Sequence, residues 1–114
     1  MWFAIGGGVV AVAALGTWLV FAWGSSGRLG RNPIIGIRTA VTRTSDAAWV
    51  DTHHAAMMQS TGFMIGAVVA GVAAIVQFSD AGSAAFAFWL ALGVYVIGLA
   101  RGIYKGVRAA ESAK

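Results

Sequence analysis

Three long stretches of this chain contain almost no charge, and they constrain its fold more than any other feature. They run over residues 2–23, 57–78 and 84–104. A helix over the first is about 33 Å long, enough to cross a membrane hydrocarbon core. Only 11% of the 114 residues are charged, and a soluble chain this short cannot bury so much apolar surface. The sequence therefore predicts an all-α membrane protein, a single domain over residues 1–114 with three transmembrane helices.

The first stretch has two interpretations. A secretory signal peptide has a positively charged start and a shorter apolar core, followed by a cleavage site of small residues. Here no Lys or Arg precedes Arg28, and the apolar run is long. We therefore expect a retained membrane helix over residues 2–23.

The basic residues orient the three spans. All eight lie either in the segment 24–56 or from Arg101 onward, and the short turn predicted at 79–83 has none. Three spans place the segment 24–56 and the C-terminus on the same side of the membrane. The positive-inside rule makes that side the cytoplasm. The prediction is an N-terminus outside and a C-terminus inside.

A helix is expected to begin well before the second span. Ser45 is a good N-cap residue, and Asp46 would lie in the first turn, at the positive end of the helix dipole. A continuous helix from Ser45 to Phe78 is about 50 Å long, more than a membrane needs. We therefore predict an amphipathic cytoplasmic extension before the second span. It either projects into the cytoplasm or bends near Ser60 and lies in the interface.

Small residues recur every fourth position along the second and third spans. In lipid, where hydrophobicity does not drive helix association, such residues let backbones approach closely. Packing within the three-helix unit, a homo-oligomer and docking onto a larger partner all fit this pattern. The candidate packing positions are Gly62, Gly66, Ala70, Gly98, Gly102 and Gly106.

The segment 24–56 between the first two spans holds the more specific pattern. Asn32 and Pro33 predict a turn, because Pro fixes φ and lacks a donor. Three isoleucines follow within the next four residues and are too apolar for a free loop, so we expect them to enter the interface or pack under the helices. Gly36 interrupts them, and it permits a close backbone approach or a positive φ.

Two side chains of this segment have several candidate roles. The guanidinium of Arg38 suits lipid phosphate, backbone carbonyls or an ion pair with Asp46 or Asp51. Trp49 and His53 are four residues apart and therefore share a helix face. His53 can be a hydrogen-bonding strut, a proton carrier or a metal ligand. Because the chain has no cysteine and its two histidines are adjacent, no metal site is predicted.

These residues resemble the signature of the SdpI family of bacterial membrane proteins, which reads approximately N-x-x-x-G-I-R-T-x-x-T-x-x-S-x-x-x-W-x-x-T-H-R. The sequence departs from it at Ala40, where the family often has Pro, and at His54, where it has Arg. The resemblance covers the C-terminal portion of the founding type, which has additional spans before the motif. The candidate motif and partner-binding residues are Asn32, Pro33, Gly36, Arg38, Thr39, Thr42, Ser45, Trp49 and His53.

The resemblance implies immunity to a secreted membrane-active toxin and, in the founding type, sequestration of a transcriptional repressor at the membrane. It also implies the plasma membrane of a bacterium as the location of a multi-pass protein. A toxin-immunity or signalling protein would act by binding a toxin or protein partner at the membrane. The alternative is an accessory subunit of a larger membrane complex, such as a respiratory supercomplex or a transporter.

Other classes are disfavoured by the residues themselves. The chain shows no Ser/His/Asp set, paired carboxylates or phosphate loop, so neither an enzyme nor a cofactor is predicted. The spans contain no acidic residue, which disfavours a transporter acting alone. The predicted partners are the lipid bilayer and a protein, and no nucleic acid.

Overall fold

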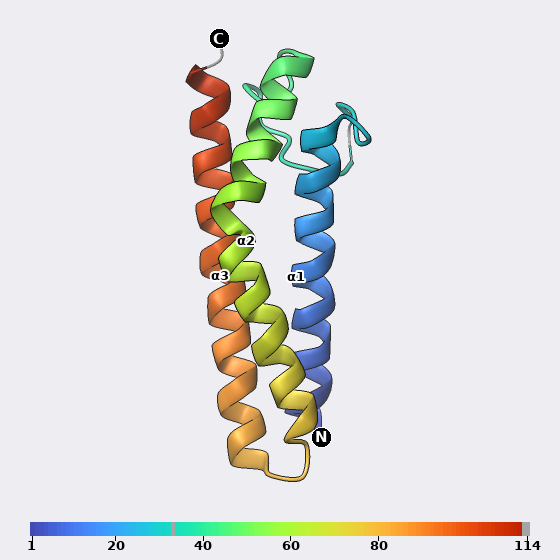
Figure 1. Ribbon diagram of the computed structural model, residues 1–114, viewed down its shortest axis with the longest axis vertical. Coiled ribbons are helices and arrows are strands. Elements are labelled where there is room, and N and C mark those ends of the chain that lie inside the picture. Colours follow the sequence, from blue (N-terminus) through green and yellow to red (C-terminus); the bar gives the residue numbers. More distant parts are fainter. Residues whose placement is uncertain (33, 113–114) are drawn as a thin grey trace. The chain divides into compact units, whose positions relative to one another are not determined.

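The computed structural model describes residues 1–32 and 34–112 (Figure 1). Three α-helices account for most of them: α1 over Trp2–Ser26, α2 over Asp46–Val76 and α3 over Ala81–Ser112. Each helix is long and apolar enough to cross a membrane, with a mean hydropathy of 2.0, 1.8 and 2.0 in its most apolar stretch. The described residues contain no strand. The predicted all-helical protein with three membrane-spanning helices is therefore confirmed, and the orientation of the spans stays a prediction.

The helix α2 begins where its cap was expected. The Ser45 hydroxyl oxygen accepts a hydrogen bond from the Ala48 N–H at 3.0 Å, and the Ser45 carbonyl accepts one from the Trp49 N–H at 3.1 Å. A side chain that satisfies one of the free N–H groups of the first turn sets the start of a helix. From there α2 stays helical through Ser60 to Val76.

The turn between α2 and α3 lies earlier than the predicted segment 79–83. The chain between the two helices comprises residues 77–80, and α3 already begins at Ala81. The reason is Asp80, whose carboxylate accepts hydrogen bonds from the Ser83 N–H at 3.3 Å and from the Ser83 hydroxyl at 2.9 Å. These bonds lower the pKa of the Asp80 carboxyl. Asp80 thus caps α3, and the residues after it are helical.

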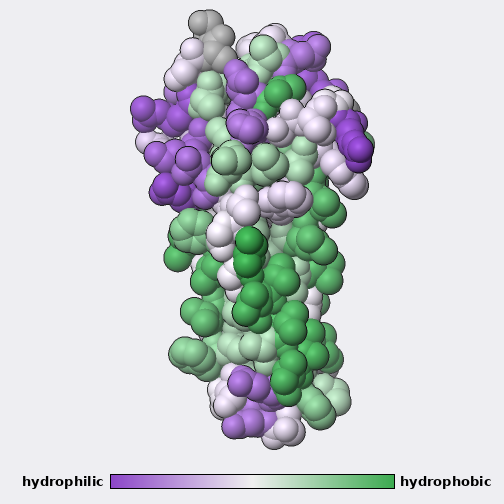
Figure 2. Space-filling model, in the orientation of Figure 1, coloured by the Kyte–Doolittle hydropathy of each residue, from purple (hydrophilic) through white to green (hydrophobic). Residues whose placement is uncertain are grey.

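The chain divides into two compact units, and each helix contributes to both. Unit 1 comprises Met1–Gly16 and Gly62–Gly98, and unit 2 comprises Thr17–Thr61 and Leu99–Lys114. Unit 2 therefore contains the connection between α1 and α2, residues 27–45. Figure 2 shows a mainly apolar surface over unit 1 and many hydrophilic side chains over unit 2.

Unit 1 packs through small residues. A Cβ placed on Gly71 of α2 would overlap the carbonyl oxygen of Gly7 in α1, so the two helix backbones are in direct contact there. A Cβ on Gly98 of α3 would likewise overlap the Cβ of Phe63 in α2. The fully or almost fully buried side chains of this unit are mostly alanines: Ala14, Ala67, Ala74, Ala84 and Ala91. Close backbone approach of this kind is typical of helices that associate in lipid.

Unit 2 has a different interior. Its apolar centre is formed by Phe21 of α1, Ile37 of the connection and Ala56 of α2, with Met57, Leu99 and Val107 packed against it. Four buried polar side chains surround this centre: Thr42, Thr52, His53 and Ser60, each with no exposed surface. Buried polar groups are costly unless they are hydrogen-bonded. Thr42, Thr52 and His53 have hydrogen-bond partners that hold the unit together, whereas the Ser60 hydroxyl has none among the described residues.

Candidate partner-binding site

The connection starts from a defined end of α1. Gly27 has a φ of 85°, which only glycine adopts without strain, and it turns the chain out of the helix. The Leu29 N–H then donates to the Trp23 carbonyl at 3.0 Å. This bond ties the first residues of the connection back onto α1 and leaves the Leu29 carbonyl available to another partner.

That partner is Trp49. The Trp49 side chain is 1% exposed, and its indole N–H donates to the Leu29 carbonyl at 2.7 Å. A buried tryptophan needs an acceptor for its N–H, and this bond supplies one. Trp49 therefore joins the start of α2 to the first residues of the connection, which are themselves bonded to the end of α1. The predicted shared face with His53 is also present, since the two ring centroids lie 4.4 Å apart.

His53 joins α2 to the middle of the connection. Its Nδ1 lies 2.8 Å from the Trp49 carbonyl oxygen, and its Nε2 accepts a hydrogen bond from the Ile37 N–H at 3.1 Å. A carbonyl can only accept and an amide N–H can only donate, so the two partners together require a neutral ring with its proton on Nδ1. Of the three roles considered for His53, this geometry matches the hydrogen-bonding strut.

Two glycines make room for the Trp49–His53 pair. A Cβ on Gly24 of α1 would overlap the His53 ring, and one on Gly36 would lie 2.8 Å from both His53 Nε2 and Trp49 Cη2. Gly36 also has a φ of 108°, so both the lack of space for a Cβ and the backbone conformation favour glycine at this position. Gly36 belongs to the predicted motif. Gly24 does not, because nothing distinguishes it in sequence from the other glycines of an apolar helix.

The remaining polar motif residues fold the connection itself. The Asn32 side-chain oxygen accepts hydrogen bonds from the N–H groups of Ile34 and Ile35 at 2.9 and 2.6 Å, which forms the predicted turn. Pro33 lies outside the described residues. Farther along, the buried Thr42 hydroxyl donates to the Ile37 carbonyl at 2.7 Å, and the Thr42 N–H donates to the Thr39 hydroxyl at 3.2 Å.

The isoleucines of the connection have different environments. Ile37 is buried in the apolar centre of unit 2, whereas Ile34 is 78% exposed and Ile35 is 48% exposed. Of the two expected environments, Ile37 therefore has the one in which it packs against the helices. Exposed isoleucines next to several arginines are consistent with entry into the membrane interface for the other two.

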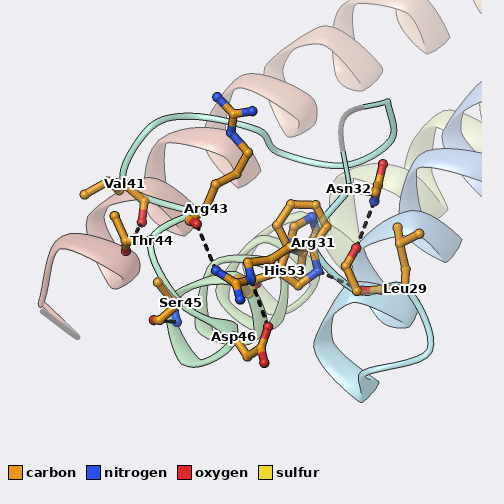
Figure 3. Close-up of polar contacts among 12 residues, drawn as sticks. Leu29, Arg31, Asn32, Val41, Arg43, Thr44, Ser45, Asp46 and His53 are labelled. Carbon is orange, nitrogen blue, oxygen red and sulfur yellow. Dashed lines mark hydrogen bonds and ion pairs between the residues drawn. The ribbon is translucent and has the colours of Figure 1, made fainter.

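Arg31 links the first part of the connection to its end and to the start of α2. Its guanidinium donates to the Asp46 carboxylate at 2.9 Å and to the Arg43 carbonyl at 3.2 Å (Figure 3). Asp46 had been considered as a partner of Arg38, and here its carboxylate pairs with Arg31 instead. The Asp46 side chain is 85% exposed, so this ion pair contributes little to stability.

Three polar motif residues are exposed: Arg38, Thr39 and Ser45. Of these, Arg38 and Thr39 line an open groove of about 450 Å³ in unit 2, together with residues of α1, the connection and α3. Its other lining residues are mostly apolar: Thr17, Val20, Phe21, Ile35, Gly36, Ile37, Leu99 and Ile103. The groove can accept an apolar group, with a guanidinium and a hydroxyl at its rim.

Of the six predicted packing positions, five lie at or near contacts with other helices, and Gly62 does not. Gly98, Gly102 and Gly106 of α3 all meet neighbouring helices closely; for Gly106, a Cβ would lie 2.7 Å from the Thr52 carbonyl oxygen. On α2, Ala70 is buried, and a Cβ on Gly66 would touch Val94 at 3.4 Å. A Cβ on Gly62 would meet nothing within 4 Å, so the structure places Gly62 away from helix contacts.

Several residues that shape the site were not among the predicted ones. Thr52 is buried and its hydroxyl donates to the Ala48 carbonyl at 2.6 Å. The Trp18 indole N–H donates to the Thr61 hydroxyl at 3.0 Å and joins α1 to α2. Thr52 stands in the W-x-x-T-H part of the signature, so that position was a usable signal. Within residues 1–32 and 34–112, no three His, Cys, Asp or Glu side chains are grouped to hold a metal ion.

The fold and the site together define a multi-pass membrane protein that resides in a lipid bilayer and carries a folded connection between its first two helices. The model of the SdpI/YfhL protein family matches residues 28–104, and the chain belongs to that family. The match extends beyond the motif, through α2 and most of α3. Searches among curated proteins and among solved structures give no significant match.

Proposed function

We propose that this protein is a toxin-immunity or signalling protein of the SdpI type, which acts by binding a toxin or a protein partner at the membrane. One observation carries the proposal. The buried motif side chains of Thr42, Trp49 and His53 bond to backbone groups of the connection, and the same fold holds Arg38 and Thr39 at the rim of an open groove. Family membership supports this role.

The charges favour the cytoplasm as the side on which the connection lies. All the basic residues within the described ranges belong to unit 2, and Asp80 is the one charged side chain in unit 1. Basic residues near membrane spans are retained on the cytoplasmic side. The bacterial plasma membrane is the location that this proposal requires.

Binding is a better fit than catalysis. Each nitrogen of the buried His53 ring is engaged with a backbone group, so this ring is a structural element rather than an available base. A catalytic site would need a nucleophile or an acid within hydrogen-bonding reach of such a base. The exposed groove, with one guanidinium at its rim, has the character of a recognition surface.

An Arg38→Ala variant tests the proposed site. Arg38 is exposed, and in cells that hold the variant and the wild type at equal levels, the substitution should abolish protection against a secreted membrane-active peptide. Arg28→Ala is the matched control, since it removes an exposed arginine of the same connection that does not line the groove. Survival of cells challenged with the peptide is the measurement. Equal protection by wild type, Arg38→Ala and Arg28→Ala would overturn the proposal.

Affinity purification in a mild detergent separates this proposal from the accessory-subunit alternative. An immunity protein should be recovered without stoichiometric partners from unchallenged cells, and its deletion should sensitise cells to the peptide. Stoichiometric recovery with a large membrane complex would favour the accessory subunit instead.

A further inference from the structure

A second groove lies in unit 2, between α2 and α3, and shares no residue with the groove at Arg38. It has a volume of about 330 Å³ and is lined by Ala55, Gln59, Tyr104, Lys105, Arg108, Ala109 and Ser112. None of these is acidic. The proposed binding function does not use this groove.

No carboxylate within residues 1–32 and 34–112 forms an ion pair with the basic residues at this groove. Arg101, Lys105 and Arg108 follow one another at intervals of four and three residues, so they lie along one side of α3. Across the described part of the chain, the one ion pair with a carboxylate is that of Arg31. Lys105 is half-buried, so its ammonium is held beside the groove, where an anion can contact it.

The other polar groups of the groove are oriented as donors. The Gln59 side-chain oxygen accepts a hydrogen bond from Arg101 at 3.1 Å, which leaves its amide NH₂ to donate elsewhere. The Tyr104 hydroxyl oxygen accepts from Arg108 at 3.0 Å, which leaves its O–H free to donate. Two cations and two neutral donors therefore surround one small polar space.

We propose that this groove binds the phosphate headgroup of an anionic phospholipid, with Lys105 and Arg108 as its cationic ligands and Gln59 and Tyr104 as neutral donors. A phosphate diester offers the negative charge and the acceptor oxygens that such a set of donors needs. The groove lies at the last turns of a membrane-spanning helix, where the apolar sequence gives way to charged residues. Basic pockets between membrane helices bind lipid headgroups in this way.

The test uses purified full-length protein in a neutral detergent and short-chain lipids, so that no bilayer surface potential contributes. The affinities for dioctanoyl phosphatidylglycerol, dioctanoyl phosphatidylcholine and inorganic phosphate are measured by isothermal titration calorimetry. We expect phosphatidylglycerol to bind more tightly than either of the other two. In a Lys105→Gln/Arg108→Gln variant, its affinity should fall by about 100-fold, or roughly tenfold for each charge-assisted hydrogen bond lost.

The matched control is an Arg28→Gln/Arg43→Gln variant, which removes the same charge from exposed positions of the connection in the same unit. It should bind phosphatidylglycerol like the wild type, and Lys105→Arg should bind within twofold of it. Circular dichroism verifies that each variant is folded, and the single Lys105→Gln variant replaces the double one if the latter unfolds. If both double variants lost the same affinity for phosphatidylglycerol, the assignment of the binding site to this groove would be wrong. Inorganic phosphate binding as tightly as phosphatidylglycerol would overturn its assignment to a lipid.

Discussion

The two units of this protein are built from the same three helices but are held together by different means. In unit 1, helices meet through glycine and alanine, and the Gly7–Gly71 contact brings two backbones together. In unit 2, large and polar side chains are buried, and Trp49 and His53 each bond to backbone groups of the connection. Small residues thus bring the helices of unit 1 into close contact, whereas specific hydrogen bonds hold the folded connection of unit 2.

The contrast has a consequence for mutations. Unit 1 should respond to the size of the side chain at a helix contact, because its helices meet through glycine and alanine. Unit 2 should respond to the loss of particular atoms, because a buried backbone group that loses its partner costs free energy.

The largest effect is expected for Trp49→Ala. The substitution empties a buried site and leaves the Leu29 carbonyl without its indole partner, so the free energy of unfolding should fall by about 3–5 kcal/mol. Trp89→Ala in unit 1 is the control, because Trp89 is 60% exposed and should lose far less. Unfolding by SDS in mixed micelles, followed by circular dichroism, gives both values. Similar losses at the two tryptophans would refute the difference between the units.

Gly71→Ala tests the size constraint in unit 1. The added methyl group would overlap the Gly7 carbonyl, which belongs to a backbone that cannot move aside easily, so a destabilisation of about 1–3 kcal/mol is expected. Gly62→Ala on the same helix adds the same methyl group in open space and should stabilise the helix by up to about 1 kcal/mol. The same SDS titration measures both. Changes of opposite sign in the free energy of unfolding would support the assigned contacts, and changes of the same sign would contradict them.

His53→Phe tests the polar constraint in unit 2. The phenyl ring keeps most of the packing but leaves the buried Ile37 N–H without an acceptor, at a cost of about 1–3 kcal/mol. The adjacent His54 is exposed and bonds only to the Ser25 hydroxyl, so His54→Phe should change stability by less than about 0.5 kcal/mol. Hydrogen exchange at the Ile37 amide should accelerate only in the His53 variant. Unchanged exchange there would show that His53 is not its acceptor in solution.

The sequence predicted those parts of the molecule that depend on neighbouring residues. Hydropathy identified the three spans, and the local chemistry of Ser45 identified the start of α2. The shared face of Trp49 and His53 follows from helical spacing alone. The helix α3 begins earlier than the predicted turn at 79–83 allows, because the Asp80 carboxylate accepts hydrogen bonds from Ser83 and so caps the helix.

The contacts between distant segments could not be predicted in the same way. The partners of Trp49 and His53 are backbone groups of Leu29 and Ile37, and any residue type carries such groups. Gly24 is one of 16 glycines, and only the position of His53 in space distinguishes it. The regular spacing of small residues likewise does not distinguish Gly62, where an added Cβ meets nothing within 4 Å, from the glycines at helix contacts inside the chain.

The smallest effect is expected at the N-cap of α2. Ser45→Ala removes the acceptor of the Ala48 N–H and should cost about 1 kcal/mol, while Ser45→Asp keeps an acceptor and should cost much less. Hydrogen exchange shows which amides lose protection when the cap is removed. Faster exchange should be confined to the first turn of α2, and the amides of residues 62–76, which belong to unit 1, should exchange as in the wild type. If these amides also exchanged faster, one continuous helix would transmit the loss, and the two units would have to be treated as one cooperative structure.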